Sequence, residues 1–192
     1  MSALTLQLPP HLKFTDNQFV QLVAVNKDLR LELTSQGELI IMPPTGGETG
    51  NRNFELYLDL GNWNRQTKLG KAFDSSTGFK LPNSATRSPD ASWVSMERWE
   101  ALTPQQRKKF LPLCPDFAVE LLSENDLLED TQQKMREYLE NGLRLGWLIN
   151  PQDKQVEIYR PNREVEVLQS PPTLQGEDVL PGFVLDLEPI FI

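Results

Sequence analysis

The chain has 192 residues, 39% hydrophobic and 24% charged, which is typical of a globular protein and long enough for one well-buried core. Nineteen basic and 27 acidic residues give a formal net charge of −8, so a nucleic-acid-binding chain must keep its basic surface local, take one from a partner or bind weakly. The acidity equally fits a cation-binding site or a soluble surface. The single cysteine, Cys114, and the single histidine, His11, exclude an intrachain disulfide and a cysteine zinc site.

No apolar stretch approaches the roughly 20 residues of a membrane helix. The segment Met1–Phe14 has no basic region followed by an apolar run, so no signal peptide is predicted. No repeat or Gly/Ser linker divides the chain. We therefore expect one cytoplasmic domain over residues 1–192, with no membrane partner.

The first predicted elements are a helix and a hairpin. Thr15 and Gln18 resemble a capping box at the start of the helix. Leucines then alternate with polar residues over Leu29–Thr34, which predicts a half-buried strand. The turn Ser35–Gly37 returns the chain into Glu38–Met42 as a second strand.

A second helix is predicted after the loop Pro43–Gly47. It carries Phe54, Leu58 and Trp63 and ends near Gly70. The later predicted elements are strands at about Lys71–Leu81 and Asp90–Val94, short helices at Met96–Leu102 and Pro104–Phe110, a strand at Phe117–Leu122, a helix at Asp126–Asn141, and strands at Arg144–Ile149, Gln155–Tyr159, Glu164–Gln169 and Val184–Leu187.

This order of elements predicts an α/β fold of the α+β type, with a central mixed β-sheet flanked by helices. It does not predict regular βαβ winding. Neither a GxGxxG loop nor a phosphate-binding Walker loop is present.

Glu120 is the most informative residue, because it lies inside the apolar run Phe117–Leu122. A carboxylate in such a strand loses hydration that a cation or hydrogen bonds must replace. The alternatives are a structural ion pair with an arginine and a side chain that faces solvent.

Asp90 follows Pro89 at the start of a predicted strand. Pro-Asp is also common turn chemistry, so Asp90 alone allows both a turn and a ligand. Asp116 follows Pro115 in the same way, and we interpret it as a strand-entry residue.

Lys134 lies at the border of the apolar stripe of the helix after Glu120. From there a long side chain can run along the core and bring its ammonium group to a site at the strand ends. The alternatives are ordinary exposure of the ammonium and an i,i+4 pair with Asp130.

Together these three residues suggest a mechanism. Two carboxylates on adjacent strands can hold Mg²⁺ through oxygen ligands. A metal there polarises a phosphoryl oxygen and activates water, and the lysine stabilises the negative charge that develops. Asp90, Glu120 and Lys134 would thus suit hydrolysis of a phosphodiester.

Several segments resemble a large family of uncharacterised putative restriction endonucleases within the PD-(D/E)-x-K nuclease superfamily. The segments lie between about Leu29 and Pro151: Leu31-Glu32-Leu33, Gly37-Glu38-Leu39, Met42-Pro43-Pro44, Arg87-Ser88-Pro89-Asp90, Pro115–Ser123, Lys134, Tyr138, Gly142 and Trp147–Pro151. Their combination is specific, although no single segment is.

The resemblance implies a restriction-endonuclease-like fold and a nucleic-acid substrate, with DNA favoured. By position, Asp90 corresponds to the first acid of the motif and Glu120 to the second. The usual lysine should come two residues after the glutamate, where this chain has Leu122. The family uses a lysine on the next helix instead, here Lys134.

Members of the family often carry a further polar residue on an early helix, which makes Glu48 the candidate third metal ligand. Many relatives have a histidine in this region and this chain does not. Glu48 also fits an ordinary acid in the first turn of a helix. Superfamily nucleases often pair to cut two strands, and the apolar C-terminus, Val184–Ile192, also favours a homodimer.

Two further classes of function stay open. A non-catalytic binding or regulatory module that kept the nuclease fold would explain Leu122 and the net charge of −8. A structural or interaction protein would use Asp90 and Glu120 only in ion pairs.

Overall fold

The computed structural model describes residues 3–6, 8, 12 and 14–192, so His11 lies outside the described residues. The helices are α1 (Asp16–Val25), α2 (Gly47–Thr67), α3 (Met96–Ala101), α4 (Leu128–Glu140) and α5 (Glu188–Phe191). The strands are β1 (Leu4–Leu6), β2 (Arg30–Leu33), β3 (Leu39–Met42), β4 (Gly70–Asp74), β5 (Phe79–Lys80), β6 (Thr86–Arg87), β7 (Ala91–Ser95), β8 (Phe117–Leu121), β9 (Leu145–Asn150), β10 (Gln155–Tyr159), β11 (Glu166–Gln169), β12 (Thr173–Gln175) and β13 (Val184–Asp186).

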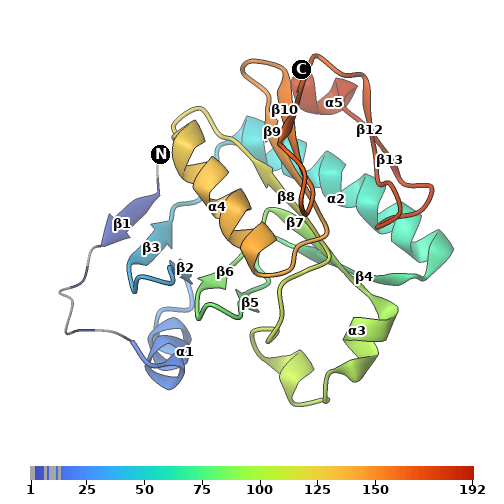
Figure 1. Ribbon diagram of the computed structural model, residues 1–192. Helices are drawn as coiled ribbons and strands as arrows, with labels where there is room; N and C mark the ends of the chain where they lie inside the picture. The colour runs from blue at the N-terminus through green and yellow to red at the C-terminus, as the bar shows by residue number, and fades with distance from the viewer. Residues whose placement is uncertain (1–2, 7, 9–11, 13) are drawn as a thin grey trace.

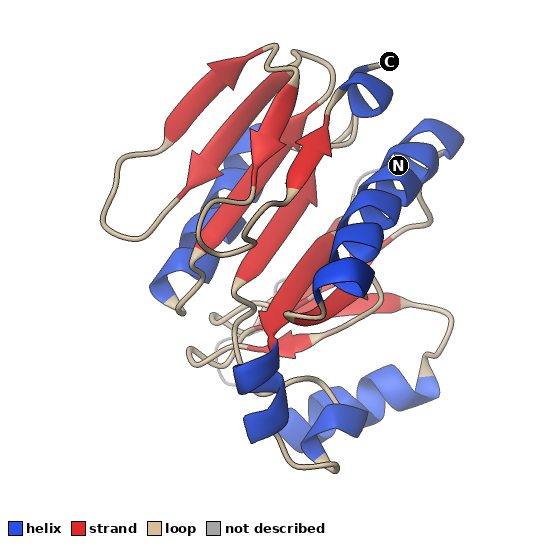
Figure 2. Ribbon diagram, turned by 90° about the vertical axis from the view of Figure 1, so that its right-hand side faces the viewer, coloured by secondary structure: helices blue, strands red, loops and turns tan. Residues whose placement is uncertain are grey.

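The centre of the fold is a six-stranded sheet in the order β11-β10-β9-β8-β7-β4. Strands β8 and β9 are parallel, and the other neighbours in this sheet are antiparallel. Helix α4 makes the crossover between β8 and β9 on one face, and α2 covers the opposite face (Figure 1). Figure 2 shows the strands side by side with helices on both sides of them. The predicted mixed sheet flanked by helices is confirmed.

A second sheet has five strands in the order β1-β3-β2-β6-β5. It contains the predicted hairpin, now β2 and β3, and α1 packs against it through Phe19. The predicted capping box is present, because the hydroxyl of Thr15 accepts from the backbone N–H of Gln18. Strand β6 leads directly through Ser88–Asp90 into β7, so this segment connects the two sheets.

The alternating strand at β2 is more buried than its pattern predicts. Leu31 and Leu33 face a hydrophobic cluster, as expected. Glu32 on the other face is only 2% exposed, and Thr34 is also buried. The expectation of a half-buried strand is therefore wrong, because Arg87 from the neighbouring strand β6 and Lys134 from α4 both contact Glu32 on the polar face of β2.

Helix α2 buries only one of the three apolar residues predicted for it, Trp63. Phe54 and Leu58 are exposed, whereas Leu56, Leu60 and Trp63 are buried in the main core. The buried residues also follow helical spacing, so both stripes fit the sequence, and packing against the sheet selects the second.

Two other predicted elements differ from the structure. Lys71–Leu81 is not one strand, because the carboxylate of Asp74 accepts from the backbone N–H of Ser76 in a turn that separates β4 from β5. Within the predicted helix Pro104–Phe110, only a 3₁₀ turn at Gln106–Lys108 forms. The short strands β1, β6 and β12 and the helix α5 were not predicted.

Among the described residues, no helix combines the length and the apolar character needed to cross a membrane.

Candidate metal and active site

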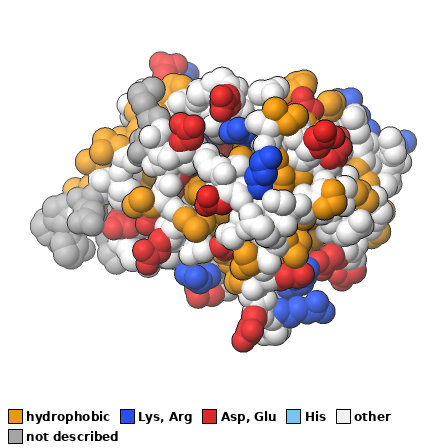
Figure 3. Space-filling view, turned by 90° about the horizontal axis from the view of Figure 1, so that it is seen from above, with side chains coloured by type: hydrophobic (Ala, Val, Ile, Leu, Met, Phe, Trp, Pro, Cys, Tyr) orange, Lys and Arg blue, Asp and Glu red, His pale blue; other side chains and the backbone are white. Residues whose placement is uncertain are grey.

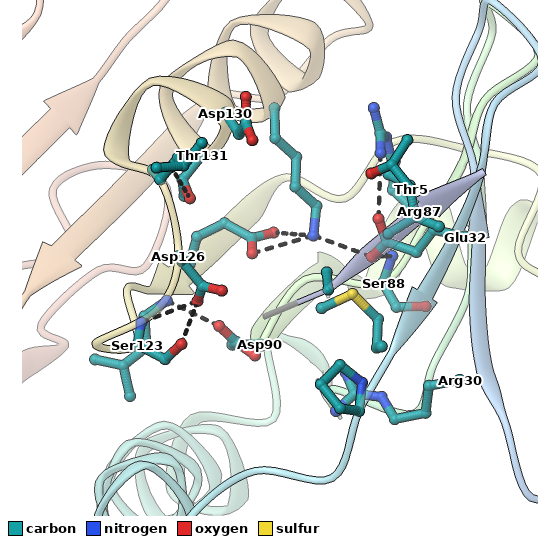
Figure 4. Close-up of a pocket in the computed structure, with 18 of the residues that line it drawn as sticks. Thr5, Arg30, Glu32, Arg87, Ser88, Asp90, Ser123, Asp126, Asp130 and Thr131 are labelled. Carbon is teal, nitrogen blue, oxygen red and sulfur yellow. Dashed lines mark hydrogen bonds and ion pairs between the residues drawn. The ribbon is translucent and has the colours of Figure 1, made fainter. Parts of the chain in front are cut away.

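A cavity of about 1220 Å³ lies between the two sheets and α4. Asp90, Glu120, Lys134 and Glu32 line it, together with the start of α2. Figure 4 shows Asp90 and Glu32 among the side chains around it. Pockets for small ligands usually have volumes of about 300–1,000 Å³, so this cavity is larger than a typical small-ligand pocket.

Glu120 lies in β8, a strand that is buried along its whole length. Its Oε1 accepts a hydrogen bond from the hydroxyl of Tyr138 at 3.0 Å and lies 3.0 Å from Nζ of Lys134. Burial raises the pKa of this carboxyl to about 7, because the lost hydration outweighs the attraction of Lys134, and the negative charges of Asp90 and Glu32 act in the same direction. Of the alternatives for Glu120, a solvent-facing side chain is excluded.

Lys134 reaches the site from α4, as the border position of its stripe predicted. Its ammonium group lies between two carboxylates, 3.0 Å from Glu120 and 3.0 Å from Oε1 of Glu32. Burial lowers the pKa of Lys134, but Glu120 and Glu32 outweigh that effect and the net shift is upward. The ammonium group is therefore charged, and its carboxylate partners are Glu120 and Glu32. These differ from Asp130, the alternative partner considered from the sequence.

Leu122, at the position of the usual motif lysine, is 7% exposed. Its backbone N–H donates to the carbonyl of Ile149 across the sheet. Leu122 is thus buried and contributes a backbone hydrogen bond, and the ammonium group beside Glu120 comes from Lys134.

Asp90 precedes β7 directly. Ala91 pairs with Val119 in the antiparallel β7–β8 ladder, so one further step of the register puts Asp90 opposite Glu120. The backbone N–H of Leu121 donates to Oδ2 of Asp90 at 2.8 Å and fixes the side chain. Burial raises the pKa of the Asp90 carboxyl, although this N–H, Lys134 and Arg30 oppose the shift.

A second cluster of charged side chains, Glu32, Arg87 and Glu137, adjoins Lys134 and was not predicted. Oε2 of Glu32 lies 3.2 Å from Arg87, and its Oε1 accepts from the backbone N–H of Ser88 at 2.9 Å. Arg87 also binds Glu137 at 2.6 Å. Burial raises the pKa of Glu32, but Lys134, Arg87 and the Ser88 N–H outweigh it, and the net pKa is lowered. The only sequence signal was the position of Glu32 and Arg87 in two of the resembling segments.

Glu48 lies in the first turn of α2, where its side chain is 81% exposed and lies 3.6 Å from Arg52. It lines the same cavity as the two acids. Across the part of the chain that the structure describes, no three His, Cys, Asp or Glu side chains form a group able to hold a metal ion. The structure therefore does not bring Glu48 together with Asp90 and Glu120.

Asp116 lies at the other end of β8. It accepts from the backbone N–H of Ser95 at 2.8 Å and lies 3.0 Å from Arg98. These contacts fit the predicted strand-entry role.

Asp90 and Glu120 together fit one hard cation. They are opposed carboxylates on adjacent strands, and burial makes the charged form of both unfavourable without a compensating positive charge. Mg²⁺ is typically held by one or two carboxylates and several water molecules, so it does not need a third protein acid.

Glu120 also predicts a pH dependence of stability in metal-free protein. Its pKa is about 7 when folded and 4.5 ordinarily, so the folded state binds this proton more tightly. The resulting stabilisation is complete below the unfolded pKa and is lost as pH rises through the folded pKa. We expect the free energy of unfolding of wild type, relative to that of Glu120→Gln, to decrease as the pH is raised from 4.5 to about 7.

Urea denaturation in the presence of a chelator, at several pH values, measures this difference in the free energy of unfolding. Glu164→Gln, an exposed change of the same kind, should keep the wild-type pH dependence. Parallel profiles for wild type and Glu120→Gln would show that the pKa of Glu120 is not raised.

The architecture is that of a nuclease fold. A crystal structure described as that of a putative nuclease belonging to DUF820 from Anabaena variabilis matches with a TM-score of 0.78 and 20% sequence identity, over 93% of this chain and 97% of that chain. At that identity the match shows the fold.

Within this class, the chain belongs to the Uma2 family, whose description is "Putative restriction endonuclease" and whose family model matches residues 16–188. The resemblance inferred from the sequence is confirmed. A search of the curated proteins found no match.

Proposed function

We propose that the protein is a Mg²⁺-dependent endonuclease that hydrolyses phosphodiester bonds of nucleic acid, with DNA as its substrate. Asp90 and Glu120 hold the cation, for which Mn²⁺ can substitute, and Glu48 is an accessory acid at the rim of the cavity. The observation that carries the proposal is the ammonium group of Lys134, 3.0 Å from Glu120 and in the same cavity as Asp90. Membership of the Uma2 family supports it.

When bound, Mg²⁺ would supply Lewis-acid activation of the phosphoryl group and of water. Lys134 is placed to stabilise the negative charge that grows on the phosphoryl oxygens as water attacks phosphorus and the P–O bond breaks. Glu32 holds this ammonium group from the other side, so Lys134 keeps one carboxylate partner when Glu120 takes up a cation. The hydrogen bond from Leu121 orients Asp90.

Calorimetry with Mg²⁺ and Mn²⁺, on wild type and on Asp90→Asn with Glu120→Gln, tests the proposal first. We expect binding to wild type and none to the double variant. Asp178→Asn with Glu164→Gln is the matched control, because it removes the same two charges at exposed positions. Cleavage of DNA and RNA with either metal follows. Absence of cleavage across several substrates, together with absence of metal binding, would contradict the proposal.

The second candidate is a non-catalytic binding or regulatory module with the nuclease fold. It is favoured by the contacts of Glu120, whose two oxygens already lie 3.0 and 3.1 Å from Lys134. In this case, Lys134 itself serves as the cation of the site. Wild type would then show neither metal binding nor cleavage in the experiments above.

We also infer a cytoplasmic homodimer. Val184 and Ile192 are 46% and 85% exposed in the apolar C-terminal segment, and paired copies could cut both strands of a duplex. Sedimentation velocity measures the association state directly.

A further inference from the structure

Arg30 enters the cavity from the start of β2 and has unused hydrogen-bond donors. One of its terminal nitrogens donates to the backbone carbonyl of Ser75 at 2.8 Å. Its Nε is buried and has no acceptor among the described residues. Buried donors without a partner are uncommon in native proteins, and one on a cavity wall points to a ligand or a water molecule as the acceptor.

The other positive charges of the cavity differ from Arg30. Five cationic side chains line it. Three of them have carboxylates within 4 Å, namely Lys134, Arg87 and Arg52. Arg30 has none at that distance among the residues that the structure describes, and neither has Arg136, which is exposed. Arg30 is thus the partly buried cation whose charge is not already paired.

Arg30 also lies close to the proposed metal site. Its charge acts on Asp90, with which it shares the cavity wall. Figure 4 shows its side chain extending from β2 toward the side of the cavity where Asp90 lies. An anion that bridges Arg30 and a cation on Asp90 would therefore meet positive charge from both sides.

An acidic protein needs such a charge to hold a polyanion. On the face seen in Figure 3, basic side chains lie singly among acidic ones and do not form one continuous patch. The formal net charge is −8. Positive groups within the cavity, such as Arg30, are placed to attract a nucleic acid to the site itself.

We propose that Arg30 binds a phosphate group of the nucleic-acid backbone beside the Asp90–Glu120 pair. A guanidinium group offers parallel N–H donors that match two oxygens of a phosphate, which a lysine cannot reproduce. This inference rests on the proposed function, because it names a substrate contact of the same site. Arg30 binds the substrate, and Asp90, Glu120 and Lys134 serve the cleavage reaction.

Binding without cleavage tests this contact. The probe is a fluorescein-labelled DNA duplex of about 20 base pairs, measured by anisotropy with Ca²⁺ in place of Mg²⁺ over a series of KCl concentrations. Electrophoresis verifies that the probe stays intact. The proteins are wild type, Arg30→Gln, Arg30→Lys and the control Arg163→Gln, which removes one charge from an exposed turn between β10 and β11.

We expect Arg30→Gln to bind at least about tenfold more weakly at low salt, as for a lost charge-assisted hydrogen bond. The slope of log affinity against log salt should become shallower by about 0.9, which corresponds to one lost phosphate contact. Arg30→Lys should keep the wild-type slope but bind more weakly, because charge remains and the forked geometry is lost. Arg163→Gln should bind as wild type does.

The outcomes separate the two proposals. If wild type binds the duplex and Arg30→Gln binds equally well, the Arg30 contact is refuted and the nuclease proposal stands. If wild type neither binds nor cleaves, both fail together. Circular dichroism and urea denaturation verify that Arg30→Gln is folded without the Ser75 contact. If Arg30→Gln is not folded, the affinity of Arg30→Lys tests the contact instead. Wild-type affinity in Arg30→Lys would refute the bidentate contact.

Discussion

Lys134→Met should reduce the cleavage rate by about 10²–10³-fold, the loss typical when one group that stabilises transition-state charge is removed. The same change should lower the free energy of unfolding by about 3–5 kcal/mol, because it leaves buried carboxylates short of a positive charge. Glu120 loses both of its contacts with the ammonium group, and Glu32 keeps only Arg87 as a cationic partner. Single-turnover cleavage and urea denaturation measure the two effects separately.

A second substitution separates catalysis from stability. Adding Glu120→Gln to Lys134→Met removes the uncompensated acid, so we expect the double variant to be more stable than the sum of the single changes predicts. The cleavage rate should fall at least as far as in Lys134→Met alone, because a proposed metal ligand is also lost. Lys108→Met, an exposed change, is the control and should alter neither quantity. Full cleavage activity in folded Lys134→Met would exclude the proposed role of this residue.

Glu32→Ala should lower the free energy of unfolding by a similar amount, about 3–5 kcal/mol. Three donors converge on this buried carboxylate: Lys134, Arg87 and the backbone N–H of Ser88. Removing it leaves all three with fewer acceptors in a buried site. Thermal or urea denaturation at neutral pH, where Glu32 is ionised, measures the loss.

Glu32→Gln distinguishes the carboxylate charge from its hydrogen bonds. A glutamine oxygen in place of Oε1 can still accept from Ser88 and Lys134, whereas the amide nitrogen in place of Oε2 cannot accept from Arg87. The cost should therefore be smaller than that of Glu32→Ala. Glu164→Ala should stay within about 0.5 kcal/mol of wild type, as expected for an exposed side chain. Since Glu32 is one of the two carboxylates at Lys134, both Glu32 variants should also reduce cleavage. If Glu32→Ala were as stable as wild type, the buried charge network would not contribute to folding.

The acids of the site were visible in the sequence for local reasons. Glu120 interrupts an apolar run, and Asp90 opens a strand after a proline. Adjacent strands then place the two opposite one another, as the β7–β8 register shows. The position of Lys134 was also predictable, because helical spacing put it at the border of the buried stripe.

Glu32 illustrates what local patterns do not reveal. Its strand reads as half-buried, with polar side chains toward solvent. Its partners Arg87 and Lys134 lie 55 and 102 residues further along the chain. Only the pairing of β6 beside β2 and the packing of α4 near them bring these residues together, and the pattern of a single strand does not record such contacts.

By itself, the sequence determined the mixed fold with flanking helices, the family and the candidate acids and lysine, because hydrophobic periodicity and short motifs act over neighbouring residues. Tertiary structure decided which face of α2 is buried, which acids share Lys134, and that Glu48 lies apart from Asp90 and Glu120. These outcomes depend on how separate elements pack, and residues far apart in the chain interact only after that packing exists.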